Sequence, residues 1–188
     1  MPGQSSEREL VSGCLAGKRH TQHQVYERFA PRMLALCARY IREDFEAEEV
    51  MISGFLKVFS KISQFKSEGS FEGWIRRIMV NECLNHLRKK KRIYTEMDLQ
   101  NVSDFVDYNQ YENEVEAEML LNCINQLPDG YRTVFNLYAI EGYSHKEVSE
   151  MLGISENTSK SQLSRARAWL QKLVMERKKN LINCPHNS

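Results

Sequence analysis

The residues best suited to chemistry in this sequence are cations and small hydroxyls spaced along one stretch near the C-terminus. Lys160, Ser164 and Arg167 recur at helical spacing, and Ser161 and Arg165 stand beside them. Long cations attract phosphates, and Lys or Arg can bind the acceptor edge of guanine in the major groove of DNA. Small serines let a helix backbone approach DNA closely. The pattern predicts a nucleic-acid-binding helix, with an ordinary solvated basic helix as the alternative.

A second polar set lies on another predicted helix. Arg77, Asn81, Asn85 and Arg88 stand at i, i+4, i+8 and i+11, so they share one helix face. Asparagine is a poor helix former, and two asparagines in mid-helix therefore need a reason. An asparagine amide both donates and accepts hydrogen bonds, so it can bind base edges. A polar, solvated face is the alternative interpretation of this set.

The sequence also predicts the elements that position the first set. Ser144 and Glu147 have the spacing of a capping box, which places a helix start at His145. Gly153 ends that helix, because glycine enters the left-handed conformation without penalty. Ser155 then caps a second helix, which carries the basic set. Two helices joined by a short turn with a glycine predict a helix-turn-helix of the kind that binds DNA.

The length, net charge and cysteine content of the chain limit the classes of protein to which it can belong. The chain has 188 residues, a net charge of +1 and five cysteines. Because the cysteines are scattered, without a CxxC pair, free thiols in a reducing compartment are favoured over disulfides or zinc. No apolar run could span a bilayer, and the N-terminus lacks a signal segment. We therefore expect a cytoplasmic protein without membrane insertion, metal or cofactor.

Hydrophobic periodicity predicts an all-α protein of two small helical domains joined by a flexible acidic linker. The first domain covers residues 7–92, and the second, the helix-turn-helix domain, covers residues 115–178. The segment between them, residues 93–114, breaks the helical period and contains acidic residues but no Lys or Arg. Such a connector is expected to avoid DNA.

One helix of the first domain begins at Asp44 and has Glu48 and Glu49 in its first turns, where the helix dipole favours anions. Its apolar spacing places Ile52 and Leu56 on the face expected to pack in the core.

The loop Ser63–Ser70 contains Lys66 and ends in a capping serine, which starts a fourth helix. We expect this helix to run through Lys90. His86 and His145 have no catalytic partner near them in sequence, so both are interpreted as surface or DNA-facing residues.

Six motifs follow one another along the chain in an order and spacing that a known family shares. They are AEEV, FLKVF and FEGWIRRIMVN with its continuation LNHLR in the first domain, and INQLPDGYRTVFNL, EGYSHKEVSEMLGIS and TSKSQLSRAR in the second. Together they resemble the extracytoplasmic-function sigma factors of bacterial RNA polymerase, over about Leu10 to Lys178. Several motifs in one order are more specific than a helix-turn-helix alone.

The resemblance implies a function and a set of partners. A member of this family binds core RNA polymerase and directs promoter-specific transcription initiation; it is not an enzyme and has no small-molecule substrate. Its partners would be promoter DNA and core polymerase, through the β′ clamp helices and the β subunit. The linker would run near the RNA exit path. The sequence leaves open whether an anti-sigma factor binds the chain, and it names neither the promoter nor the inducing signal.

The resemblance also implies residue roles. The −35 element would be read by Lys160, Ser161, Ser164, Arg165 and Arg167. The −10 element would be met by Lys66, Arg77, Asn81, Asn85 and Arg88. The polymerase clamp would be bound by Glu48, Glu49 and Ser53.

Two places depart from the family pattern. Ile52 and Ser53, followed by Gly54, stand where a Gln–acid pair is usual, and Gln162 replaces a frequent arginine on the recognition helix.

Three other functions fit parts of the sequence. A stand-alone helix-turn-helix repressor or activator, with an N-terminal dimerisation or sensing domain, would bind DNA tightly without polymerase. An enzyme of RNA or DNA metabolism would need a nucleophile–base pair, a phosphate loop or a metal cluster, and no such motif is present. An interaction adaptor would leave Asn81 and Asn85 unexplained.

Overall fold

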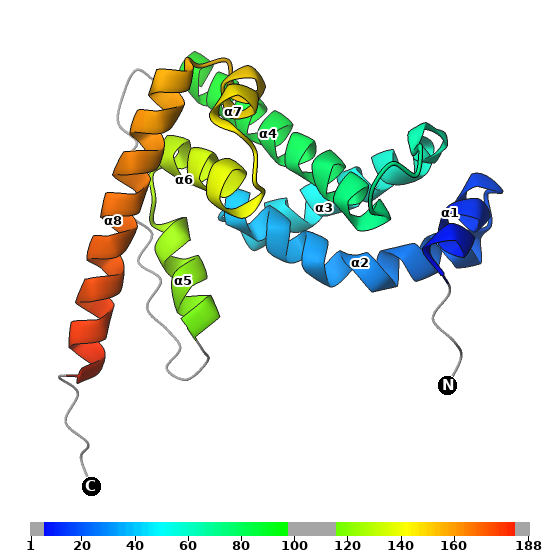
Figure 1. Cartoon of the computed structure of the whole chain (residues 1–188), viewed down its shortest axis with the longest axis horizontal. Helices are drawn as coiled ribbons and strands as arrows, with labels where there is room; N and C mark the ends of the chain where they lie inside the picture. The colour runs from blue at the N-terminus through cyan, green and yellow to red at the C-terminus, as the bar shows by residue number, and fades with distance from the viewer. Residues whose placement is uncertain (1–5, 98–115, 183–188) are drawn as a thin grey trace, which may run out of the picture. The chain divides into compact units, whose positions relative to one another are not determined.

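The computed structural model describes residues 6–97 and 116–182, with side chains for residues 6–90 and 119–176. Within these ranges every regular element is a helix, and the chain divides into two compact units, Met1–Gln100 and Asn101–Ser188 (Figure 1). The predicted all-α fold class is confirmed. Residues 98–114 of the predicted linker 93–114 lie outside the described residues. None of the helices in the described ranges has both the length and the apolar character that crossing a bilayer requires.

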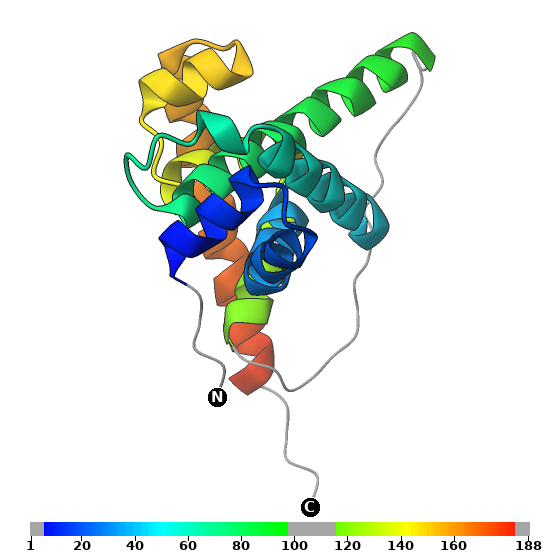
Figure 2. The same cartoon turned by 90° about the vertical axis from the view of Figure 1, so that its right-hand side faces the viewer.

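The first unit is built on three long helices. Its elements are α1 (Glu7–Leu15), α2 (Arg19–Tyr40), α3 (Asp44–Ser60), the 3₁₀ turn η1 (Ile62–Gln64) and α4 (Phe71–Met97). Helices α2, α3 and α4 pack against one another, and α1 packs on α2 and η1 (Figure 2). Helix α3 begins at Asp44, as predicted. Helix α4 continues past its predicted end at Lys90, because the Lys, Arg, Glu and Met residues that follow favour helix even where the apolar period stops.

The buried face of α3 differs from the predicted one. Ile52 and Leu56 were expected in the core, but they are 45% and 66% exposed. The residues of α3 that are buried are Ala47, Val50, Met51, Gly54, Phe55 and Val58. A Cβ on Gly54 would lie only 2.2 Å from Sδ of Met79 in α4, so this glycine permits the close approach of the two helices. The core therefore fixes which face of α3 is inward, and Ile52 and Leu56 lie outside it.

The second unit is organised around one long helix. Its elements are α5 (Glu116–Asn125), α6 (Asp129–Phe135), the π-helix η2 (Asn136–Ile140), α7 (His145–Leu152) and α8 (Glu156–Ile182). Helices α5, α6 and α7 all pack on α8. Instead of one regular helix to Gly142, α6 widens into η2, where Glu141 N–H donates to the carbonyl of Asn136 at 2.9 Å. Gly142, with φ +81°, ends this segment.

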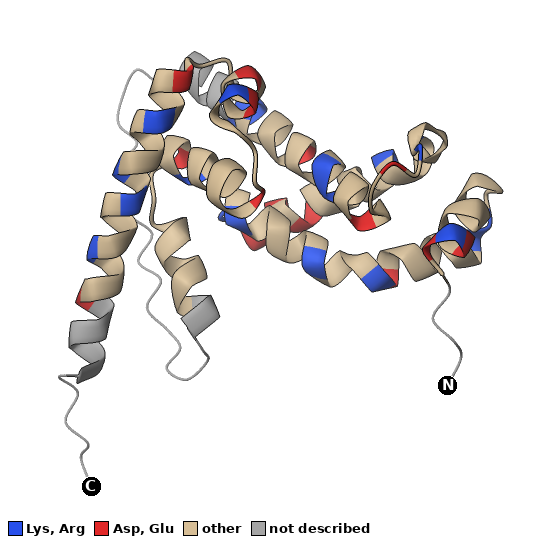
Figure 3. Ribbon diagram, in the orientation of Figure 1, with Lys and Arg blue, Asp and Glu red and all other residues tan. Residues whose placement is uncertain are grey.

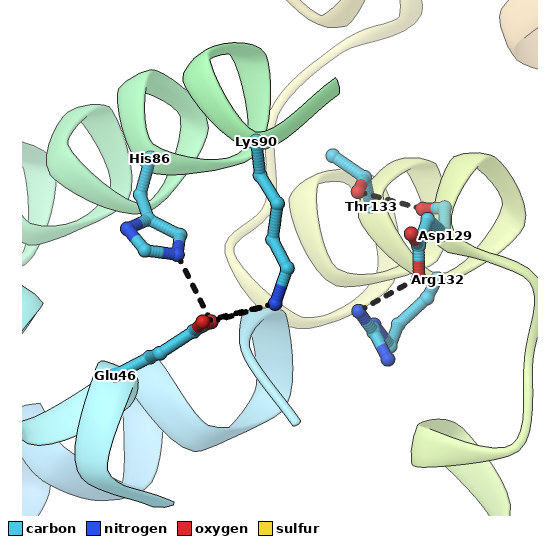
Figure 4. A network of polar contacts seen from close by, with 6 residues as sticks. All are labelled: Glu46, His86, Lys90, Asp129, Arg132 and Thr133. Carbon is cyan, nitrogen blue, oxygen red and sulfur yellow. Dashed lines mark hydrogen bonds and ion pairs between the residues drawn. The ribbon is translucent and has the colours of Figure 1, made fainter. Parts of the chain in front are cut away.

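A buried arginine at the start of α6 was not expected from the sequence. Arg132 is 2% exposed, and its Nη2 donates to Oδ1 of Asp129 at 3.0 Å. Thr133 Oγ1 donates to the backbone carbonyl of Asp129 at 2.7 Å (Figure 4). Asp129 thus ties together the first turn of α6, where Pro128 is the residue before the helix.

The four cysteines in the described residues are free and buried: Cys14, Cys37, Cys83 and Cys123. In the first unit, a hydrogen bond with Cys37, together with burial, raises the pKa of the Cys83 thiol well above its usual value. Burial also raises the pKa of Cys14. Thiols in this state are poor nucleophiles, so their role in the native fold is packing.

Candidate nucleic-acid and polymerase interfaces

The helix-turn-helix is formed by α7 and α8, and its local signals act as predicted. Ser144 N–H donates to Oε2 of Glu147 at 2.8 Å, and Ser144 Oγ accepts from Glu147 N–H at 3.3 Å. Gly153 ends α7 in the left-handed conformation, with φ +66°. Thr158 N–H then donates to Ser155 Oγ at 3.0 Å, which caps α8. The start of α7, its end at Gly153 and the start of α8 are therefore each set by hydrogen bonds between residues close in sequence.

A buried contact joins the two helices of this motif. Nδ1 of His145 lies 2.9 Å from Oγ of Ser159, which is fully buried in α8. The imidazole also stacks on Tyr138 of η2, with 4.2 Å between ring centroids. His145 is therefore a half-buried packing residue, and its interpretation as a surface or DNA-facing residue was wrong. The sequence signal for this contact is a small residue, Ser159, in register with the buried Leu163.

The outer face of α8 carries all five residues predicted to read DNA. Each of them is exposed: Lys160, Ser161, Ser164, Arg165 and Arg167. Figure 3 shows that Lys and Arg, in blue, alternate with uncharged residues along α8. The α8 outer face, as these five residues are called below, is therefore accessible along two turns of the helix.

Two arginines on this face are oriented by tyrosines of the neighbouring elements. Nη1 of Arg165 donates to Oη of Tyr131 in α6 at 3.4 Å. The guanidinium of Arg167 lies 6.0 Å from the ring centroid of Tyr138 in η2. Residues two apart on a helix point in nearly opposite directions, so Arg165 and Arg167 border the α8 outer face on its two sides.

Gln162 lies at the edge of this face and turns inward. A Cβ added to Gly130 of α6 would be 3.5 Å from its Oε1, and Gln162 is half-buried. The residue that replaces a frequent arginine of the resembled family thus faces α6.

The predicted polar set on α4 lies on one accessible face, but its members differ in what they contact. Arg77, Asn81 and Arg88 are exposed, whereas Asn85 is half-buried. Nη1 of Arg88 donates to Oδ1 of Asn85 at 3.0 Å, and Nδ2 of Asn85 donates to Oε1 of Glu82 at 3.5 Å. The amide of Asn85 is engaged within α4, so Asn81 is the better candidate for contacting a base. The α4 stripe, as it is called below, consists of Arg77, Asn81, Asn85 and Arg88.

The loop Ser63–Ser70 leads into the same helix. Lys66 in this loop is exposed, and Ser67 and Gly69 have positive φ angles of 58° and 99°. Ser70 Oγ accepts from Gly73 N–H at 3.0 Å, which confirms the predicted cap of α4. The loop therefore presents Lys66 directly before the helix that carries the α4 stripe.

The third set lies on α3. Glu48, Glu49 and Ser53 are all exposed. They surround an apolar strip made by Phe45, Ile52 and Leu56, which are 72%, 45% and 66% exposed. These six residues are the α3 face below. Three large apolar side chains in a row on a helix surface are typical of a protein-binding site.

Glu46 on the same helix is directed into the first unit instead. Its carboxylate accepts from Nζ of Lys90 at 2.9 Å, and Nε2 of His86 lies 3.1 Å from it (Figure 4). Burial raises the pKa of Glu46, but the hydrogen bonds from Lys90 and His86 outweigh burial and lower the pKa. His86 is therefore part of a link between α3 and α4, which corrects its interpretation as an isolated surface residue.

Both units match known families. Residues 25–93 match the family described as Sigma-70 region 2, and residues 117–170 match Sigma-70, region 4. The ECF RNA polymerase sigma factor SigM of Mycobacterium tuberculosis is 28% identical over 170 residues, which cover 90% of this chain and 85% of SigM. SigW of Bacillus subtilis is 29% identical over 160 residues, which cover 79% of this chain and 86% of SigW.

Solved structures show the same fold. The sigma factor RpoE of Bartonella quintana, in complex with the anti-sigma factor NepR, superposes with a TM-score of 0.57 and 22% identity over 81% of this chain and 96% of that chain. CnrH, in complex with the cytosolic domain of CnrY, superposes with a TM-score of 0.51 and 21% identity over 92% of this chain and 99% of that chain.

Proposed function

The chain belongs to the extracytoplasmic-function sigma factors of bacterial RNA polymerase, and on that premise we propose which of its surfaces performs each step of initiation. A sigma factor binds core polymerase and directs it to promoters. The proposal assigns the α8 outer face to the −35 element, the α4 stripe with Lys66 to the −10 element, and the α3 face to the polymerase clamp. We place this activity in the cytoplasm, where bacterial transcription occurs.

The α8 outer face has the chemistry for the major groove. The recognition helix of a helix-turn-helix contacts base edges with residues of its N-terminal half. Lys160 and Arg165 can donate to guanine, and Ser161 and Ser164 are short enough to keep the helix close to the DNA. Arg167, at the border near η2, is suited to a phosphate. Tyr131 orients Arg165 before DNA arrives, which lowers the cost of ordering that side chain.

The α4 stripe has the chemistry for an opened strand. The Asn81 amide offers a donor and an acceptor to an exposed base edge, while Arg77, Arg88 and Lys66 offer charges to the neighbouring phosphates. Extruding a base costs a few kcal/mol, which a binding pocket must offset. Asn85 supports this surface by holding Arg88.

The α3 face has the chemistry for a protein partner. Interfaces concentrate their free energy in a buried apolar centre surrounded by polar residues, and Phe45, Ile52 and Leu56 surrounded by Glu48, Glu49 and Ser53 have that arrangement. We assign this face to the β′ clamp helices. A shallow groove on the second unit, lined by Phe135, Leu170, Gln171, Val174 and Met175 beside Arg167, is assigned to the β subunit.

An inhibitory partner is also proposed. The structure of RpoE is that of a sigma factor in complex with the anti-sigma factor NepR, and the structure of CnrH is a complex with the cytosolic domain of CnrY. An anti-sigma factor for this chain would cover the α3 face, because three exposed large apolar residues, Phe45, Ile52 and Leu56, lie together there.

The observation that carries the proposal is an exposed basic recognition helix in the same chain as an exposed apolar α3 face. The test is transcription reconstituted with core polymerase on a promoter library, with sequencing of transcript starts. A stand-alone regulator would instead bind DNA specifically without core polymerase. Unaltered start sites on adding the protein, with tight DNA binding by the protein alone, would favour that alternative.

Arg165 variants test the −35 assignment in the same assay. Arg165→Ala should cost roughly 1–3 kcal/mol on the best promoters and relax the preference at one base position, because a base contact discriminates and a phosphate contact does not. Arg165→Lys keeps the charge but loses the two-pronged geometry, so a base contact predicts that both variants lose specificity. Start-site usage and strength unchanged in Arg165→Ala would exclude the assignment.

A further inference from the structure

Helix α1 precedes the segment that matches Sigma-70 region 2, and neither matched region gives it a role. Helix α1 is nevertheless capped at its start and packed against the rest of the first unit. Ser6 N–H donates to Oε2 of Glu9 at 2.7 Å, and Ser6 Oγ accepts from Glu9 N–H, so a capping box starts the helix. Leu10, Val11 and Cys14 are buried. Helix α1 is therefore an integral part of the first unit.

The position of α1 is fixed by a close contact with α2. A Cβ on Gly13 would lie 2.4 Å from Oγ1 of Thr21, which means that no larger residue fits at this crossing. Helix α1 also contacts η1, the turn that leads into the loop Ser63–Ser70. The start of this loop thus rests against α1.

Glu7 extends the contact of α1 to the end of the same loop. Its carboxylate accepts a hydrogen bond from the backbone N–H of Phe71, the first residue of α4. The N–H groups of a first helical turn have no partner within the helix, and a carboxylate placed there also interacts favourably with the helix dipole. Ser70 satisfies one of these groups and Glu7 another, so α4 has two caps from different parts of the chain.

Between these two fixed ends the loop has little freedom. Ser67 is a non-glycine residue with φ 58°, a conformation that persists only where the surroundings determine it. Phe65 packs on Phe71 and Trp74, with ring centroids 5.2 and 5.5 Å apart. Lys66 stands between Phe65 and Ser67, so its direction depends on the anchoring of the loop at η1 and at Phe71.

We propose that Glu7 is a positioning residue for promoter opening. By binding the N–H of Phe71, it holds the loop Ser63–Ser70 and the first turn of α4 in the arrangement that presents Lys66 and the α4 stripe to the −10 element. This inference rests on the proposed role of that loop and adds α1 to the opening machinery. Glu7 acts through Phe71 and touches no nucleic acid.

Three variants test the proposal. Glu7→Ala removes the acceptor, Glu7→Gln keeps a neutral carbonyl that can still accept, and Glu27→Ala removes the same charge from an exposed pair with His23, 3.2 Å apart on α2. Each is assembled with core polymerase on a duplex promoter, and the rate of opening is followed by permanganate reactivity of thymines in the −10 element. We expect Glu7→Ala to open about fivefold more slowly, with Glu7→Gln within about twofold of the wild type and Glu27→Ala unchanged.

A promoter mismatched through the −10 element separates positioning from general stability. It should restore most of the activity of Glu7→Ala, because the duplex is already open. Equal slowing on the mismatched promoter, weaker binding to core polymerase, or equal loss in Glu7→Gln would overturn the positioning role and leave Glu7 as a stabilising cap.

Lys66→Ala in the same assay distinguishes failure of this inference from failure of the proposed function. Slower opening by Lys66→Ala with normal opening by Glu7→Ala would reject the role of Glu7 alone. Normal opening by both would reject the −10 role of the loop, and the positioning role with it.

Discussion

Glu46 is a carboxylate that the fold uses internally, although it lies on the helix assigned to the polymerase clamp. It links α3 to Lys90 and His86 of α4, and these hydrogen bonds lower its pKa in spite of burial. A carboxyl whose pKa is lower in the folded than in the unfolded state adds stability that is present above the unfolded-state pKa. That stability is lost as the pH falls through the folded-state pKa. The link between α3 and α4 should therefore weaken in acid.

We expect Glu46→Gln to lower the free energy of unfolding of the first unit at pH 7 by roughly 0.5–1 kcal/mol, since a partly exposed ion pair contributes little. The difference from the wild type should shrink as the pH falls below the ordinary value of 4.5. Urea unfolding followed by Trp74 fluorescence, in a Trp169→Phe background, measures both quantities. Glu27→Gln should show no such convergence, and parallel curves for Glu46→Gln would contradict the link.

At the scale of elements, α3 shows that an exposed apolar face can be mistaken for a core face. Its sequence is apolar on two sides, and periodicity alone does not say which side packs. The packed structure decides the question: Val50, Phe55 and Val58 are buried, and Gly54 between them leaves room for the side chain of Met79. Ile52 and Leu56 are consequently exposed, as is Phe45 on the same face.

Truncation on the α3 face should weaken binding to core polymerase without unfolding the protein. Leu56→Ala is expected to reduce affinity about tenfold, which corresponds to roughly 1.4 kcal/mol, while the melting temperature stays within about 1 °C because Leu56 is 66% exposed. Leu15→Ala, an exposed leucine on α1 at 53%, is the control. Titration of labelled protein with core polymerase gives the affinities.

Charge reversal on the same face adds a second measurement. Glu48→Lys combined with Glu49→Lys should slow association, and more so at low salt. If neither this pair nor Leu56→Ala changes affinity, then the α3 face does not bind core polymerase.

The helix-turn-helix depends on one left-handed residue. Gly153 has φ +66°, so Gly153→Ala should destabilise the second unit by roughly 1–2 kcal/mol and lower its melting temperature by about 4–8 °C for each kcal/mol lost. Gly130 sits in α6, where a Cβ would meet nothing closer than 3.5 Å, and Gly130→Ala should be neutral or stabilise by up to about 1 kcal/mol. Calorimetry compares the two, and equal melting temperatures would refute the backbone argument.

The elements that sequence reasoning predicted well are those set by short-range rules. Ser144, Gly153 and Ser155 fix the ends of α7 and α8 through contacts three or four residues apart, and such spacings are visible in a sequence. The contacts of Glu46 with Lys90, of Glu7 with Phe71 and of His145 with Ser159 join separate elements. Sequence spacing does not show which residues of separate elements meet; at most it marks one partner, as the small Ser159 in register with Leu163 does, so the pairs themselves emerged only from the three-dimensional structure.

At the scale of the whole molecule, the chain has two compact units, each with its own core and its own surface assigned to DNA. The α4 stripe belongs to the first unit and the α8 outer face to the second. The resemblance predicted these two DNA-binding surfaces. The structure adds a difference between Asn81 and Asn85 as candidates for contacting a base, because the amide of Asn85 is already hydrogen-bonded to Arg88 and Glu82. On the proposed assignments, this division would separate recognition of the closed promoter from its opening.

Asn81→Ala should therefore form the closed complex normally and open it poorly. On the proposed assignments, the second unit of this variant would still bind the −35 element, whereas the first would lack the amide proposed to hold an extruded base. Opening on a duplex promoter should be slowed about tenfold or more, and a promoter mismatched through the −10 element should recover most of the transcription. Asn85→Ala is the comparison and should act mainly through Arg88. Opening by Asn81→Ala at the wild-type rate would identify Asn81 as a solvated polar residue.

The buried thiols also provide each unit with a chemical probe, because the rate at which a thiol is labelled reports how often its unit opens locally. A buried thiol reacts with a disulfide reagent only after local opening, since the attacking species is an accessible thiolate. Cys83, whose pKa is raised by the hydrogen bond with Cys37 and by burial, would report the first unit, and Cys123 the second. In a Cys184→Ser background, labelling rates would time the engagement of each unit by polymerase and promoter. The order in which the thiols become protected would then record the order of assembly.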